Sequence, residues 1–397
     1  MRKNCIFITI CVIILSITSF GQTAQDYHNV IKDVGEEPKQ FIAHKMQQRD
    51  LIIFDDALHA AVGPFEFYCN YLAQYPESVD YVFLEVVPIT AQASIDSFLN
   101  SASKDSSLLH DAFQQDFRYG WPYETYLTLF SKVWDINQRL SPENKIRIIG
   151  VDQPIYWEGL HNRQDYNLFK KSLIARDNFM YQTILQHMDN FESGKKGLFL
   201  TNTRHAYKCI KNSKGKIYWN AGTFFHEWHP GKTYSVRFHN LILYVETKKE
   251  NTKNTSMEGL DEMVYKWVRM DNGKWDKAFE QNGNRAVAIP FANNIFGEHR
   301  YLGNHMADIA PGQTMYDAYD ALIFWRPLEK TRFSAHTNFF YTEEFKQEVK
   351  HRVRVIHGHD LKDFLDKNKV ANVSEYVEKL AKYVPEKRNP LVKSIQK

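Results

Sequence analysis

The sequence has 397 residues, of which 43% are hydrophobic and 14% aromatic, so it can bury a large core and is not a disordered chain. Its formal net charge of +3 at pH 7 is nearly balanced, which argues against nucleic acid as a partner. The length allows one large domain or two of ordinary size.

The N-terminus has the pattern of a secretory signal peptide. The basic "MRKN" precedes the apolar "CIFITICVIILSITSF", and Ser19 and Gly21 occupy positions −3 and −1 of a cleavage site before Gln22. This stretch is too short to favour a membrane span and no later one is apolar enough, so we expect no stable membrane insertion. An uncleaved N-terminal anchor is the alternative. We therefore expect residues 1–21 to be removed and the protein to be exported, to the periplasm or outside the cell.

Strand-like and helix-like patterns alternate along the rest of the chain. Apolar runs at 50–54, 80–86, 145–151 and 196–202 read as buried strands, and helical patterns occupy 64–75, 91–115, 123–140 and 164–190. Further strands are expected at 233–239, 286–290 and 319–325, with a polar loop at 247–256 and an amphipathic stretch at 257–280. This alternation predicts an α/β domain over 22–335, with a mixed, mostly parallel central sheet flanked by helices. Residues 336–397 are charged and are expected to form a helical C-terminal extension.

Acidic residues and histidines fall at the ends of the first four predicted strands. Asp56 and His59 follow the first strand, Glu85 lies at the second, Asp152 follows the third and His205 follows the fourth. Because the carboxyl ends of parallel strands share one edge of a sheet, where ligands bind, we expect these side chains to converge there.

These residues also have structural interpretations. Asp56 could cap the following helix, Asp152 could shape the turn before Pro154, and each histidine could be a satisfied core residue. Glu85 follows three apolar residues, and a buried carboxylate needs a partner. The two cysteines that remain after cleavage, Cys69 and Cys209, lack the CxxC spacing of zinc-thiolate sites, and the sequence leaves their pairing open.

Several common enzyme motifs are absent from the sequence. It has no strand–GxSxG–helix elbow, no HExxH, no GxGxxG after the first strand and no Walker loop. A histidine beside carboxylates can work as a general base near neutral pH, and histidine and carboxylate can also hold a metal ion. The residues therefore indicate water activated either by histidine or by a metal.

The order of these motifs resembles that of the erythromycin esterase-like group, within a superfamily that includes ChaN-like haem-binding lipoproteins. The resemblance covers roughly residues 45–330. Where the group has Gly-Glu-x-x-His after its first strand, this chain has "DDALH" at 55–59. The other matching segments are the strand ending in Glu85, "WPYETYLTLFSKVWDINQRL", Gly150 and Asp152 in "IRIIGVDQP", Arg176, Asp177 and Met180 in "ARDNFM", His205 in "LTNTRHA", "NAGTFFHEWHPGKTYSVRFH", and "YDALIFW".

The resemblance implies an esterase-like hydrolase in which His59 activates water without a metal. Asp56 and Glu85 would orient His59, Arg176 would brace the site or bind a developing anion, and His205 would be a second acid–base or oxyanion partner. No cofactor is expected in that case. The alternative is a haem- or metal-binding protein, in which His59, Glu85 and His205 would be the ligands of a divalent metal. The altered first motif also leaves open a member without catalytic activity.

The aromatic stretch "IYWNAGTFFHEWHPG" suggests an apolar small-molecule substrate, although ordinary core packing explains it as well. Together with the strand ends, it gives Asp152, Trp219 and Phe225 as the predicted substrate-binding residues.

Overall fold

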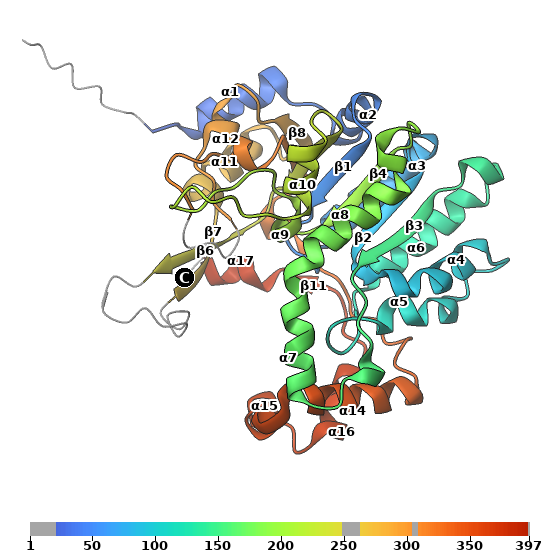
Figure 1. The fold of residues 1–397 in the computed structure, drawn as a ribbon. Helices are drawn as coiled ribbons and strands as arrows, with labels where there is room; N and C mark the ends of the chain where they lie inside the picture. Colours follow the sequence, from blue (N-terminus) through green and yellow to red (C-terminus); the bar gives the residue numbers. More distant parts are fainter. Residues whose placement is uncertain (1–20, 248–262, 304–308, 396–397) are drawn as a thin grey trace, which may run out of the picture.

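The computed structural model describes residues 21–247, 263–303 and 309–395, and a seven-stranded sheet forms its centre (Figure 1). All neighbouring strands of this sheet are parallel except β8 and β9, which pair antiparallel. The predicted mixed, mostly parallel sheet is thus confirmed. In spatial order its strands are β3 (Arg147–Asp152), β2 (Tyr81–Pro88), β4 (Gly197–Thr201), β1 (Leu51–Asp55), β5 (Thr233–Phe238), β9 (Ala321–Phe324) and β8 (Val287–Pro290).

Helices cover both faces of the sheet and create two hydrophobic cores. Side chains alternate along β1, so that Ile52 and Phe54 pack into one core whereas Leu51 and Ile53 pack into the other. The first core contains residues of α2 (Pro38–Gln48), α3 (Val62–Gln74), α4 (Gln92–Asn100), α5 (His110–Gln114) and α6 (Glu124–Asn137). The second contains residues of α1 (Ala24–Val34), α8 (Arg176–His187), α10 (Ala221–Trp228), α11 (Lys274–Gln281), α12 (Ile295–Glu298) and α13 (Met315–Ala318).

Two of the predicted helices are divided in the structure. The stretch 91–115 forms α4 and α5, and the stretch 164–190 forms α7 (Arg163–Ser172) and α8, separated by a 3₁₀ turn at Leu173–Ala175. A two-stranded hairpin of β6 (Ile242–Thr247) and β7 (Met263–Val268) was not predicted. The predicted loop at 247–256 lies outside the described residues except for its first position, and the amphipathic stretch at 257–280, where described, is β7 followed by α11.

The C-terminal segment is joined to the rest of the fold. Its helices are α14 (Glu343–His357), α15 (Leu361–Asn368), α16 (Val373–Leu380) and α17 (Pro390–Ile395), and α14 packs beside α7 (Figure 1). Arg163 donates hydrogen bonds to the carbonyls of Ile356 and His357, both at 2.8 Å. The short strands β10 (Arg332–Phe333) and β11 (Lys387–Arg388) pair as well. The C-terminal residues thus share the first core, through Val349, Val353 and Val377 among others.

The predicted signal peptide lies outside the described residues apart from Gly21. Within the described part of the chain, the helices are all too short or too polar to cross a bilayer.

The sheet geometry brings the ends of β2 and β3 close together beside the predicted site. A β-carbon added to Gly150 of β3 would come within 2.7 Å of the Val87 carbonyl oxygen and 2.8 Å of the Pro88 carbonyl oxygen. Glycine at this position therefore permits the approach of two strands that carry Asp152 and Glu85.

Candidate active site

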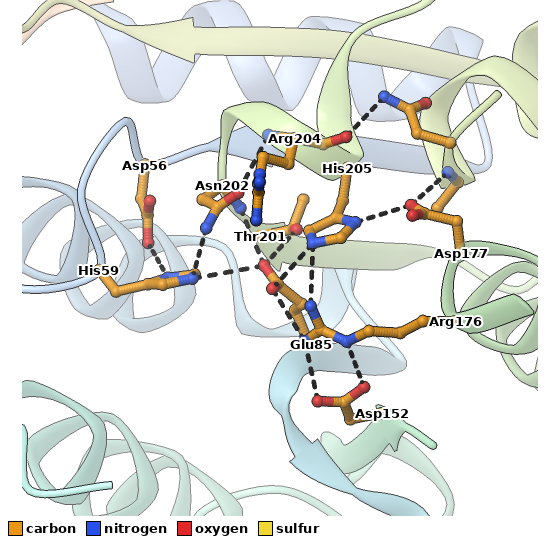
Figure 2. Close-up of polar contacts among 12 residues, drawn as sticks. Asp56, His59, Glu85, Asp152, Arg176, Asp177, Thr201, Asn202, Arg204 and His205 are labelled. Atoms are coloured by element: carbon orange, nitrogen blue, oxygen red, sulfur yellow. Dashed lines mark hydrogen bonds and ion pairs between the residues drawn. The ribbon is translucent and has the colours of Figure 1, made fainter. Parts of the chain in front are cut away.

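Glu85 is the centre of a polar network at the carboxyl edge of the sheet (Figure 2). It lies within β2 and is only 2% exposed. Its Oε1 atom lies 3.1 Å from Nη2 of Arg176 and 3.2 Å from Nε2 of His205. Its Oε2 atom accepts hydrogen bonds from Thr201 Oγ1 at 2.6 Å and from the backbone N–H of Asn202 at 3.1 Å. The buried carboxylate is therefore fully supplied with donors.

The charge of Glu85 is stabilised by the cationic groups around it. Burial opposes ionisation, but His205, His59 and Arg176 outweigh that effect and hold the pKa of Glu85 well below its usual value. His59 contacts the same carboxylate, with Nε2 lying 3.5 Å from Oε2. The structure thus brings His59, Glu85 and His205 together, as the pattern of strand ends predicts.

His59 is held against Asp56 by a tight turn after β1. The backbone N–H of Leu58 donates to the carbonyl of Asp56 at 2.7 Å, and Ala57 adopts a φ of 61°. Nδ1 of His59 then lies 2.9 Å from Oδ2 of Asp56. Helix α3 begins only at Val62 and its N-cap residue makes no side-chain cap, so Asp56 orients a histidine and does not cap this helix.

The second ring nitrogen of His59 faces an amide donor. Asn202 follows β4 and caps the short helix α9 (Thr203–Ala206), since its Oδ1 accepts the backbone N–H of Arg204 at 3.0 Å. That bond fixes the orientation of the amide, and Nδ2 of Asn202 therefore donates to Nε2 of His59 at 2.7 Å. This geometry suits the neutral ring whose proton is on Nδ1, toward Asp56.

The carboxylates of Asp56 and Glu85, in contrast, favour the cationic form of His59. Burial disfavours the charged ring, but Asp56 and Glu85 outweigh it and raise the pKa of His59 to about 10. Burial in turn raises the pKa of Asp56 to about 6, against the opposing effect of His59. His59 is thus a strong base whose neutral fraction grows with pH across the neutral range.

The guanidinium group of Arg176 contacts three residues of the network. Nε and Nη2 donate to the two oxygens of Asp152 at 2.6 and 2.8 Å, Nη2 also contacts Glu85, and Nη1 lies 3.1 Å from Nε2 of His205. Asp152 accepts the backbone N–H of Gln153 as well, at 2.9 Å. Asp152, predicted as a substrate-binding residue, is therefore the bidentate partner of Arg176.

His205 has a carboxylate oxygen within 3.2 Å of each of its ring nitrogens. Nδ1 lies 2.7 Å from Oδ1 of Asp177 and Nε2 lies 3.2 Å from Glu85. Burial opposes protonation, but the two carboxylates raise the pKa of His205 to about 9, so the ring is cationic at neutral pH. Asp177 also accepts the backbone N–H of Ala221 at 2.9 Å, which ties the start of α10 to the site.

Asp55, the other acid of the first motif, faces away from His59. Its Oδ1 accepts the backbone N–H of Ala57 at 2.8 Å and Oγ1 of Thr203 at 2.9 Å, and its Oδ2 accepts the hydroxyl of Tyr319 at 2.7 Å. Asp55 therefore joins the turn after β1 to neighbouring elements.

Two cavities flank the network. One of about 360 Å³ is lined by His59, Asn202, Arg204 and Arg237 together with aromatic and aliphatic side chains. The other, of about 620 Å³, is lined by Arg176, Asp177, Arg204 and His205, and by Phe117, Arg118, Tyr166, Lys170, Leu173, Tyr207, Tyr218 and Trp219. Arg204 lines both, so the network lies between two spaces that could receive a ligand.

The two predicted aromatic residues have different positions. Trp219 is 46% exposed and lines the larger cavity. Phe225 is fully buried in the second core, against Tyr181 and Phe191, and lines neither cavity. Phe225 therefore packs in the core and does not line a cavity as a substrate-binding residue would, in line with the core-packing interpretation of this aromatic stretch.

The residues proposed as metal ligands do not form a free donor set. The guanidinium of Arg176 already provides a cation between Glu85, Asp152 and His205. In the described ranges, no three His, Cys, Asp or Glu side chains are grouped as a metal ion would require. The hydrogen bonds of Arg176 thus occupy carboxylate oxygens that a metal ion at this position would bind.

Sequence reasoning assigned no role to Asn202 and overlooked Arg237. Asn202 has a detectable signal, since an Asn directly after a strand and before a helical turn is a typical N-cap. Arg237 also has one, because it is a charged residue inside the apolar strand β5, as Glu85 is in β2.

No family model matches the chain, and neither does any curated protein. Among solved structures it is similar to a succinoglycan biosynthesis protein, with 10% identity, a TM-score of 0.53, and coverage of 77% of this chain and 98% of the other. An erythromycin esterase variant in its open conformation shares 8% identity at a TM-score of 0.47, over 72% and 92% of the chains. A Bacillus cereus protein shares 12% sequence identity at a TM-score of 0.44, over 76% of this chain and 97% of the other. An erythromycin esterase is thus among the structural neighbours, and at these identities the likeness concerns the α/β fold alone.

Proposed function

We propose that this protein is a hydrolase that cleaves an ester- or lactone-type bond with water activated by His59. The observation that carries the proposal is the position of His59, whose Nδ1 is held by Asp56 at 2.9 Å and whose ring lines a cavity of about 360 Å³. A histidine that a carboxylate orients through one nitrogen can remove a proton with its other nitrogen once the Asn202 amide moves off it.

In the proposed reaction, a water molecule takes the place on Nε2 of His59 that the Asn202 amide now fills. Neutral His59 removes a proton from this water as its oxygen bonds to the substrate carbonyl carbon. The tetrahedral intermediate then collapses, the bond to the leaving alkoxide breaks, and the imidazolium of His59 returns the proton to the alkoxide. Asp56 holds the ring and stabilises its cationic form throughout.

The remaining residues of the network act as positioning residues in this proposal. Glu85 joins His59 to the cationic pair of His205 and Arg176, and Asp152 fixes the guanidinium of Arg176. These buried ion pairs hold the carboxyl ends of β2, β3 and β4 in one arrangement. Their role is to preorganise the base before the substrate binds.

A panel of simple substrates tests the proposal. The purified protein is incubated with p-nitrophenyl acetate, p-nitrophenyl butyrate and a small lactone, beside His59→Asn and the control His44→Asn, which changes an exposed histidine of α2. We expect hydrolysis of at least one compound by the wild type and the control, and its loss in His59→Asn. Equal hydrolysis by His59→Asn, with its circular dichroism unchanged, would refute the role of His59.

Two further proposals accompany the hydrolase. Export with cleavage before Gln22 is tested by the N-terminal sequence of the protein recovered outside the cytoplasm, which we expect to begin at Gln22.

The alternative function, haem or metal binding, is tested by titration with haemin and by metal analysis of the purified protein. A Soret band or a stoichiometric metal would favour that alternative over the metal-free reaction.

A further inference from the structure

The His59 cavity contains a buried cation that the network does not use. Arg237 lies on β5, beside Asp55 of β1 in the sheet register, and is 4% exposed. Its Nη1 atom has no hydrogen-bond partner within the part of the chain that the structure describes. A buried guanidinium with an unpaired donor is costly in a folded protein, so this atom has the character of a ligand-binding group.

Against the effect of burial, the charge of Asp55 raises the pKa of Arg237, but Nη1 remains without a hydrogen bond among the described residues. The nearest carboxylate is Asp55, whose Oδ2 lies 3.8 Å from Nη1, beyond hydrogen-bond length. Both oxygens of Asp55 already accept bonds from Ala57, Thr203 and Tyr319. The guanidinium lies over the ring of Tyr319, with Cζ 5.5 Å from its centroid, a contact that fixes its plane without occupying Nη1.

The cavity itself combines apolar walls with positive charge. Arg204 is its second cation, and the lining residues that the structure describes include no Asp or Glu. Its apolar lining includes Leu58, Trp121, Leu241, Leu243, Trp267 and Phe333. Such a cavity favours an apolar molecule that carries a negative charge at one end.

Arg176 is poorly suited to the same task. Its Nε and Nη2 atoms donate to Asp152 and Glu85, its Nη1 lies beside His205, and it lines the other cavity. An anion beside His59 therefore requires a different residue, and Arg237 is the buried cation of that cavity.

We propose that Arg237 binds a carboxylate of the substrate, and that the protein acts on apolar esters that bear such a carboxylate. This inference rests on the proposed hydrolase and names its substrate class. The carboxylate accepts hydrogen bonds from Arg237 at one end of the cavity while the ester group faces His59. Arginine suits this role because its planar guanidinium matches a carboxylate in two-point contact.

Binding of a compound that cannot be hydrolysed tests the inference separately from the reaction. The fluorescence of tryptophans, including Trp121 and Trp267 in the cavity wall, is followed during titration with 4-phenylbutyrate and with its neutral amide. We expect the wild type to bind the carboxylate roughly 10- to 100-fold more tightly than the amide. Arg237→Met should remove this preference, and Arg237→Lys, which keeps the charge, should retain part of it.

The control is Arg139→Met, which removes an exposed arginine just beyond the end of α6. It should bind the carboxylate as the wild type does. Equal affinity of the wild type for carboxylate and amide would overturn the inference, as would a preference that survives in Arg237→Met. If Arg237→Met does not fold, the comparison of the two compounds with the wild type and with Arg237→Lys still decides.

The two proposals fail in different ways. A protein that binds the carboxylate through Arg237 but hydrolyses no ester refutes the hydrolase and leaves the binding site standing. A protein that hydrolyses neutral esters through His59, with no carboxylate preference, refutes only the substrate class. A loss confined to kcat in Arg237→Met, with carboxylate binding unchanged, also refutes it and assigns Arg237 to the transition state.

Discussion

Asn202 donates its side-chain amide to Nε2 of His59 at 2.7 Å. The same amide accepts the backbone N–H of Arg204 through its oxygen, so the helix cap determines which side of the amide faces the imidazole. A local feature of the chain, the start of α9, thus selects the ring form in which Nε2 has a free electron pair. Because Asp56 and Glu85 favour the cationic form, Asn202 is the group that favours the base.

Replacement of Asn202 by Asp should impair this base. A carboxylate at 202 would still cap α9, but it would accept a hydrogen bond from the Nε2–H of cationic His59 and raise the pKa of His59 further. We expect kcat/KM at pH 7 to fall by about tenfold or more, and its pH profile to move toward alkaline pH. The measurement is kcat/KM between pH 6 and 9 for the variant and the wild type. An unchanged profile would contradict the assigned contact.

Replacement of Glu85 by Gln should strongly destabilise the fold. The variant keeps the shape of the side chain but leaves Arg176 and His205 with one carboxylate fewer in a buried setting. We expect the free energy of unfolding in urea to fall by about 3–5 kcal/mol. Asp135→Asn is the control, because it breaks an exposed ion pair with Lys104 and should cost about 1 kcal/mol or less. Similar losses in the two variants would argue against the buried network.

The contribution of His205 to stability should depend on pH. Folding raises its pKa from 6.5 to about 9, since Glu85 and Asp177 outweigh the effect of burial, with Arg176 and Asp152 close by. The folded state therefore binds the proton more tightly than the unfolded state. The stabilisation, roughly 3 kcal/mol, is complete below pH 6.5 and disappears as the pH rises through 9.

The measurement for His205 is urea unfolding of the wild type and His205→Gln at pH 6 and at pH 9.5. The difference in free energy of unfolding between the two proteins should be larger at pH 6. A difference that grows with pH would mean that the folded protein holds His205 in its neutral form.

The turn between Asp56 and His59 contains a removable strain. Ala57 has a φ of 61°, a conformation that costs a residue with a β-carbon more than it costs glycine. We expect Ala57→Gly to raise the free energy of unfolding by about 1 kcal/mol. Ala93→Gly, at an exposed position inside α4, should lower it by a similar amount, about 1 kcal/mol, because its backbone is helical. Destabilisation by both changes would show that the turn is relaxed.

The alternation of apolar runs and helical patterns was sufficient to predict the sheet and the convergence of its polar ends. Buried strands such as β1 and β4 consist mainly of apolar residues. Glu85 interrupts such an apolar run in β2, and a buried carboxylate there requires polar partners from neighbouring strands. The positions of His59, Glu85 and His205 follow from that topology. The break between α7 and α8 does not, because the helical pattern continues through Leu173–Ala175.

The roles of the arginines could not be read from the sequence. Arg176 belongs to a recognisable motif, yet the structure shows that Asp152 and Glu85 already accept its hydrogen bonds. Arg237 lies in a segment of the resemblance that gave it no role, yet its Nη1 has no hydrogen-bond partner in the described structure. Which arginine has an unpaired donor depends on residues far away in the chain, and local patterns contain no information about them.

The most direct test of the central claim is the pH dependence of kcat/KM for the hydrolysed ester, corrected for the reaction without protein. With a His59 pKa near 10, the neutral fraction of the ring grows about tenfold per pH unit below that value. We predict that log kcat/KM of the wild type rises with a slope of about one between pH 6.5 and 8.5, and that His59→Asn shows no such rise. A rate that is independent of pH over this range, or the same rise in His59→Asn, would contradict water activation by His59.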